Sequence, residues 1–146
     1  MRILVDGDAC PQKEDILLLA NKYQKEVLLF IDYAHEVDVK LYNEVIYCDV
    51  GSDSADMEIL KRVQANDLVI TQDYGLSALV LSKKALVLHV SGMFIDEGNI
   101  DELLFRRYGS TKLRKAKKHL KGPKVRDEQM KIYFIKQLEK ILKERG

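Results

Sequence analysis

The chain has 146 residues, of which 47% are hydrophobic and 32% charged, and a formal net charge of +1. This length and composition suit one globular domain built around one core. No apolar run approaches the ~20 residues that span a membrane, the first acid follows too early for a signal peptide, and two cysteines make no disulfide framework. We therefore expect a single domain over residues 1–146, a cytoplasmic location, free thiols and no membrane contact.

Short apolar runs alternate with amphipathic stretches over the first 90 residues. The apolar runs predict buried strands over 2–5, 27–31, 45–50, 67–71 and 85–90. Helical spacing of apolar residues predicts helices over 12–25, from about 56 to 63, and over 75–82. Near the first helix, Pro11 fits the first turn, with Asp8 or Cys10 near the cap. The alternation predicts an α/β fold of three layers, with a mainly parallel five-stranded sheet flanked by helices.

The character of the chain changes after Gly92. Helices are predicted over 99–108 and 112–120, and Gly122-Pro123 breaks the chain behind them. From residue 127 onward, apolar residues recur on one stripe, which predicts a last helix over 127–145. Because no low-complexity linker precedes it, we expect this helical C-terminal extension to pack on the same domain.

Four aspartates stand near the expected carboxyl ends of the strands. Asp6 and Asp8 follow the first strand, Asp73 follows the fourth, and Asp56 opens the helix between them. Parallel strands bring their carboxyl ends to one edge of the sheet, which is where α/β proteins bind ligands. Two carboxylates ~5 Å apart repel by roughly 3 kcal/mol at an effective dielectric of ~20. A divalent cation relieves such repulsion, and oxygen ligands favour Mg²⁺ or Mn²⁺.

Each of these acids also has a purely structural interpretation. Asp8 is placed to cap a helix and Asp73 to form a turn. Asp56 is placed where its negative charge stabilises the positive end of a helix dipole. We nevertheless predict that Asp6, Asp8, Asp56 and Asp73 are catalytic residues. Asp6, Asp56 and Asp73 are the predicted metal ligands, because buried or clustered acids concentrate at functional sites.

The basic residues are distributed unevenly. The segment 103–126 holds ten Lys or Arg and no acid, so the rest of the chain has 14 basic and 23 acidic residues, a net charge of −9. Such a segment binds phosphates well, with a strong salt dependence, or serves as a solvated face or an internal partner of the acidic body. The nucleic-acid-binding residues that we predict are Arg106, Arg107, Lys112, Arg114, Lys115, Lys117, Lys118 and Lys121.

Several motifs resemble one bacterial protein family. DGDACP at 6–11, SDSADMEI at 52–59, DLVITQDYGL at 67–76, NIDELLFRR at 99–107 and KGP at 121–123 are similar to the YaiI/YqxD family of uncharacterised proteins. That resemblance implies a PIN-like fold, the fold of metal-dependent ribonucleases and flap-type nucleases. It matches Asp6 and Asp73 to acids of the PIN pattern, Asp56 to its middle acid, and makes Asp8 a candidate for a fourth.

The leading functional hypothesis is a Mg²⁺- or Mn²⁺-dependent nuclease, a hydrolase acting on RNA rather than DNA. One alternative is a non-catalytic RNA-binding module on the same fold. Another is a haloacid-dehalogenase-like phosphatase, suggested by Asp6-Gly7-Asp8 after the first strand. A homodimer is a further expectation: the resemblance implies a fold whose members often pair, and the apolar stripe of the last helix suits either a core or an interface.

Overall fold

Every strand expected from an apolar run is present in one sheet of six strands. The computed structural model describes residues 1–33, 36–50, 54–106 and 127–146. The strands are β1 (Arg2–Asp6), β2 (Glu26–Asp32), β3 (Glu44–Cys48), β4 (Leu68–Thr71), β5 (Leu86–His89) and β6 (Phe94–Ile95). Their order is β3-β2-β1-β4-β5-β6, and every pair is parallel except the antiparallel pair of β5 and β6.

The expected five-stranded sheet was therefore one strand short. β6 has only two residues, which is too short for the alternating pattern that identifies a strand in a sequence. It pairs with β5 through a tight turn that includes Gly92, whose φ is +96°. This antiparallel strand closes the edge of a sheet that is otherwise parallel.

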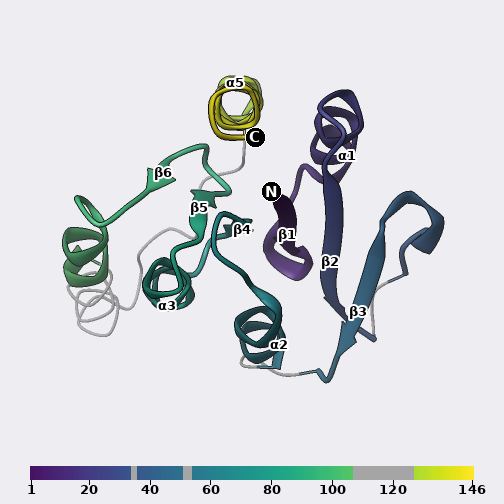
Figure 1. Ribbon diagram of the computed structural model, residues 1–146, viewed down its shortest axis with the longest axis horizontal. Coiled ribbons are helices and arrows are strands. Elements are labelled where there is room, and N and C mark those ends of the chain that lie inside the picture. Colours follow the sequence, from purple (N-terminus) through teal and green to yellow (C-terminus); the bar gives the residue numbers. More distant parts are fainter. Residues whose placement is uncertain (34–35, 51–53, 107–126) are drawn as a thin grey trace.

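Helices cover both faces of the sheet and make three layers (Figure 1). The helices with defined bounds are α1 (Lys13–Lys22), α2 (Ser54–Arg62), α3 (Tyr74–Ser82) and α5 (Glu128–Arg145), with 3-10 turns η1 (Gly7–Ala9) and η2 (Val39–Leu41). Residues 100–106 are also helical. One face of the sheet packs against α1 and α5, and the other against α2, α3 and residues 100–103.

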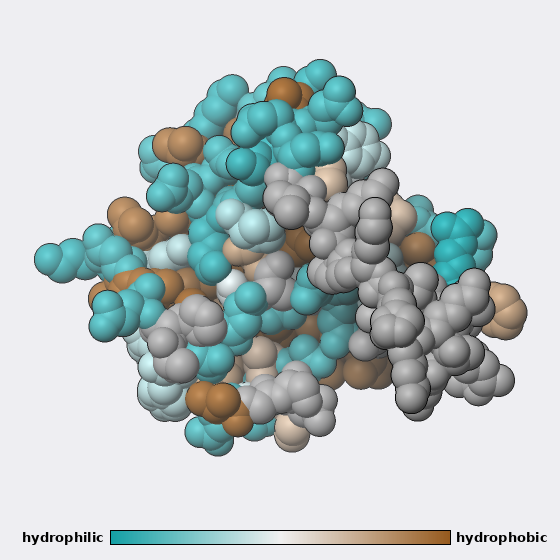
Figure 2. Space-filling model, turned by 180° about the vertical axis from the view of Figure 1, so that it is seen from behind, coloured by the Kyte–Doolittle hydropathy of each residue, from teal (hydrophilic) through white to brown (hydrophobic). Residues whose placement is uncertain are grey.

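The last helix belongs to the core. Phe134 and Leu138 of α5 are fully buried in the same apolar cluster as Ile3 and Val5 of β1. The predicted apolar stripe is thus confirmed, and it faces the sheet. None of the described helices is long and apolar enough to cross a membrane. Figure 2 shows one outer face, where the described side chains are mostly hydrophilic and the apolar ones are scattered.

The start of α1 differs from the expectation. Neither Asp8 nor Cys10 caps this helix: Gln12 is the N-cap residue and its side chain makes no capping hydrogen bond. The Gln12 amide instead donates to the Lys131 backbone oxygen of α5 at 3.3 Å, and so joins the two helices of this face. Asp8 lies in η1, before the helix, where a side chain can point to the edge of the sheet.

A buried ion pair stands at the amino end of the central strands. Asp67, whose side chain is 5% exposed, accepts hydrogen bonds from the Arg2 guanidinium at 2.7 and 3.2 Å. It also accepts from the backbone nitrogens of Arg2 and Gln64. Both of its oxygens are therefore satisfied, and its charge is balanced by a cation, as a buried carboxylate requires.

Candidate acidic site at the carboxyl edge of the sheet

The register of β1 and β4 brings Asp6 beside Thr71. Val5 pairs with Ile70, so the next residue of each strand stands at the carboxyl edge. Asp6 is 8% exposed, and its Oδ2 accepts a hydrogen bond from the fully buried Thr71 hydroxyl at 2.9 Å. The carboxylate of Asp6 is thus fixed in place by a side chain 65 positions away in the sequence.

The same Thr71 hydroxyl connects Asp6 to Asp73. It accepts a hydrogen bond from the backbone nitrogen of Asp73 at 3.1 Å. Asp73 in turn is the N-cap of α3, and its Oδ1 accepts from the backbone nitrogen of Leu76 at 3.1 Å. Thr71 therefore positions two of the predicted acids, a role that the sequence analysis did not assign. The available signal was a hydroxyl in an otherwise apolar strand, two residues before an aspartate.

Asp8 approaches the edge from η1. Its side chain is exposed, and its Oδ1 accepts a hydrogen bond from the backbone nitrogen of Asp32 at 3.4 Å. Asp32 is the last residue of β2, the strand next to β1. Of the predicted acids, Asp8 is therefore the one most open to solvent, and it extends the acidic edge from β1 toward β2.

Asp8 and Asp73 are both close enough to act on the carboxyl of Asp6. Burial raises the pKa of the Asp6 carboxyl, the negative charges of Asp8 and Asp73 raise this pKa further, and the Thr71 hydrogen bond lowers it. Among the residues that the structure describes, no cationic side chain contributes to the shift of this pKa. Asp6 is thus a buried carboxylate with two acidic neighbours and, within the described part of the chain, no positive counterpart.

Asp56 has a different position. It lies half-buried in the first turn of α2, and it is not among the acids that shift the pKa of Asp6. The acids also act on Cys48, which is buried beneath α2. Burial raises the pKa of the Cys48 thiol, and the negative charges of Glu58, Asp8 and Asp6 raise this pKa further. Cys48 therefore stays a protonated, buried thiol rather than a nucleophile.

A metal at this edge would depend partly on water. Within the described ranges, no three His, Cys, Asp or Glu side chains gather closely enough to hold an ion by themselves. Mg²⁺ is commonly held by one or two carboxylates and keeps several waters, so the oxygen-only donors of Asp6, Asp73 and Asp8 fit that ion. The structure thus brings three of the four predicted acids to one edge, without a preformed cage.

Most of the predicted nucleic-acid-binding residues lie outside the described residues. These are Arg107, Lys112, Arg114, Lys115, Lys117, Lys118 and Lys121. Arg106 is described: its side chain is exposed and pairs with Glu102 one helical turn earlier, at 2.6 Å. Its charge is thus partly balanced within its own helix, as is usual for a solvated helical face.

We expect the environment of Asp6 to make the folded state less stable as pH rises. Its pKa is raised in the folded state, so between its unfolded value and the raised value the folded state binds more protons. The free energy of unfolding then falls as pH increases through this interval and is constant above it. Asp6→Asn keeps an acceptor for Thr71 and removes the charge. Urea unfolding at a series of pH values measures this. Above the interval, the free energy of unfolding of Asp6→Asn should be larger than that of the wild type.

Thr71→Val serves as the matched variant for this pH dependence. It removes the hydrogen bond that lowers the Asp6 pKa and keeps a β-branched side chain. The interval over which stability falls should then extend to higher pH than in the wild type. Identical pH dependence in the wild type and Asp6→Asn would show that Asp6 is not destabilised by its surroundings.

The chain was also compared with known proteins. The sequence model of a family described as uncharacterised, the YaiI/YqxD family, matches residues 4–144. A UPF0178 protein of Bacillus cytotoxicus is 42% identical over 141 residues, covering 97% of this chain and 92% of its own. A UPF0178 protein of Alkaliphilus oremlandii is 42% identical over 151 residues, covering 100% of this chain and 97% of its own. Among solved structures, Rae1 (YacP) from Bacillus subtilis is similar with a TM-score of 0.46 and 20% identity, covering all of both chains.

Proposed function

We propose that this chain, which belongs to the YaiI/YqxD family, is a divalent-metal-dependent nuclease that hydrolyses phosphodiester bonds in RNA. One contrast within the sheet carries the proposal. Asp67, at the amino edge, is buried and paired with Arg2. Asp6, at the carboxyl edge, is buried beside two further acids, and no cation among the described residues acts on it. We infer that a bound divalent cation compensates the charge of this carboxylate.

The residues of the edge divide into three roles. Asp6 and Asp73 are held by Thr71 and by the amino end of α3, so they are the acids best positioned to hold the ion. Asp56, in the first turn of α2, remains a further proposed ligand. When bound, a divalent ion would activate water and stabilise the charge that develops on the phosphate. Asp8 is exposed, and we assign it the orientation of the attacking water or completion of the ligand set.

The substrate class follows from charge and from resemblance. Segment 103–126 holds ten basic residues and no acid of its own, which suits a phosphate backbone on either side of the cut. The choice of RNA over DNA rests on the resemblance of the quoted motifs to the YaiI/YqxD family, which implies the PIN-like fold of metal-dependent ribonucleases. The spacing of the basic residues matches no base-reading motif, so we expect little sequence specificity.

Cleavage of a labelled RNA pool tests this function directly. The purified protein is incubated with the pool in Mn²⁺, in Mg²⁺ and in EDTA, and the products are resolved by length. We expect cleavage with either metal and none in EDTA. Binding without cleavage under all conditions would favour the non-catalytic RNA-binding module instead. Hydrolysis of small phosphomonoesters with intact RNA would favour the phosphatase.

A further inference from the structure

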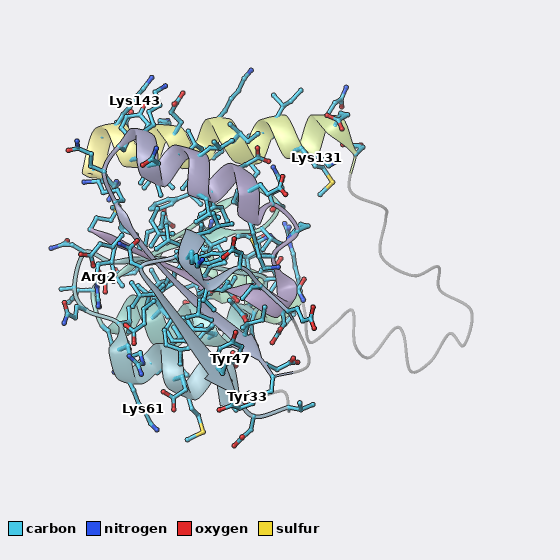
Figure 3. All side chains as sticks on the ribbon, turned by 90° about the vertical axis from the view of Figure 1, so that its right-hand side faces the viewer. Arg2, Tyr33, Tyr47, Lys61, Lys131 and Lys143 are labelled. Carbon is cyan, nitrogen blue, oxygen red and sulfur yellow. The ribbon has the colours of Figure 1, made fainter. Side chains whose placement is uncertain are left out.

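Two exposed tyrosines stack on each other at the carboxyl edge. Tyr33 directly follows β2, and Tyr47 lies in the edge strand β3. Their ring centroids are 5.3 Å apart and their planes differ by 15°. Tyr33 is 67% exposed and Tyr47 38%. Figure 3 shows both at one end of the sheet, away from Arg2 at the other end.

The core does not require this pair. Ile46 and Cys48, the neighbours of Tyr47 on β3, are buried in the cluster beneath α2, so the ring of Tyr47 lies on the opposite side of the strand. Neither tyrosine belongs to the two apolar clusters. One face of each ring covers the other, and the high exposure of Tyr33 leaves its outer face to solvent. A further planar aromatic group can extend such an offset stack.

The pair adjoins the acidic edge. Asp8 accepts a hydrogen bond from the backbone nitrogen of Asp32, the residue immediately before Tyr33. Tyr33 therefore follows directly the residue whose backbone contacts Asp8 at the carboxyl edge. Aromatic rings beside a phosphate-binding site are how proteins hold unpaired bases, whereas base-paired rings cannot reach a side chain in this way.

We propose that Tyr33 and Tyr47 form a stacking platform for an unpaired nucleobase of a single-stranded substrate, with its backbone continuing to Asp8 and the acidic edge. The inference rests on the proposed function for its substrate class. Stacking uses the face that every base shares, so the platform selects single strands over duplexes without selecting a sequence. It also places the bound base on the β2–β3 side of the site.

Binding measured without catalysis tests the platform. Fluorescence anisotropy in EDTA gives the affinity for labelled oligouridylate and for an abasic oligomer of the same length and charge. We expect Tyr33→Ala to weaken oligouridylate binding about tenfold and to leave the abasic oligomer unaffected. Tyr33→Phe, which keeps the ring, should bind as the wild type does. Tyr133→Ala, at a similarly exposed tyrosine (49%) on α5, is the matched control and should also bind normally.

Three results would overturn the platform. The first is unchanged oligouridylate affinity in Tyr33→Ala. The second is an equal loss for the abasic oligomer, which would assign the effect to the backbone or the fold. The third is a loss of self-association with unchanged RNA affinity, which would assign the tyrosines to contact with a second copy. Because EDTA suppresses metal-dependent cleavage, the platform can be confirmed or refuted whether or not the chain cleaves RNA.

Discussion

Asp73→Asn is expected to lower the rate of metal-dependent RNA cleavage about a hundredfold or more. The fold and the affinity for RNA should stay intact. The substituted amide still accepts the hydrogen bond from the Leu76 nitrogen, and Asn caps helices as well as Asp does. What disappears is one negative charge next to Asp6. Loss of a single electrostatic group at a reacting centre costs on the order of 10²–10³ in rate. Initial rates of RNA cleavage in Mn²⁺ measure the effect.

The chain offers a matched control for that substitution. Asp127 is the N-cap of α5, and its Oδ1 accepts from the backbone nitrogen of Met130 at 2.9 Å, so it repeats the capping role of Asp73 on another helix. Asp127→Asn should cleave RNA at the wild-type rate. If both variants lose activity alike, the loss belongs to helix capping, and if neither does, Asp73 has no part in catalysis.

Asp67→Ala is expected to lower the free energy of unfolding by about 3 kcal/mol. Removing one partner of a buried ion pair costs about 3–5 kcal/mol, and the lower end applies because the Arg2 side chain is 26% exposed. The backbone nitrogens of Arg2 and Gln64 also lose an acceptor. Urea unfolding followed by circular dichroism measures the change, and it should appear as a lower midpoint with an unchanged slope.

An exposed ion pair supplies the comparison for Asp67. Glu128 pairs with Lys131 at 3.4 Å, but its side chain is 82% exposed, so Glu128→Ala should cost less than about 1 kcal/mol. Below its melting temperature, Asp67→Ala should still cleave RNA, since Asp67 lies at the end of the sheet opposite to the acids. Equal destabilisation by the two substitutions would contradict the assigned role of the buried pair.

The sequence was sufficient to predict the elements that carry strong patterns. β1, β2 and β4 are buried on both faces, so they appear as continuous apolar runs, and their acids follow at the ends. The α/β class follows from these runs and the helical stretches between them, and the parallel sheet of that class places Asp6 and Asp73 at one edge. β6 was missed because two residues hold no pattern.

The contacts within the site depend on pairing that no local pattern reveals. The role of Thr71 comes from the register of β1 against β4, which sets its hydroxyl beside Asp6. Asp8 was expected near a helix cap, yet η1 places it next to Asp32, because the helix begins only at Lys13. The stacked tyrosines likewise come from β3 and from the residue that follows β2, two strands whose adjacency follows from the sheet order.

The burial of α5 has a consequence for how the chain acquires its structure during synthesis. β1 is made first and pairs with β4, more than sixty residues later. The face of the sheet that α1 begins to cover is completed by α5, which follows every strand. Such distant pairings form slowly, because a long loop must close before its contacts form. A nascent chain that lacks residues 128–145 therefore carries strands with an apolar face that is covered only in part. Until α5 is made, we expect chaperones to bind this exposed apolar surface. Premature termination before α5 would leave an aggregation-prone product.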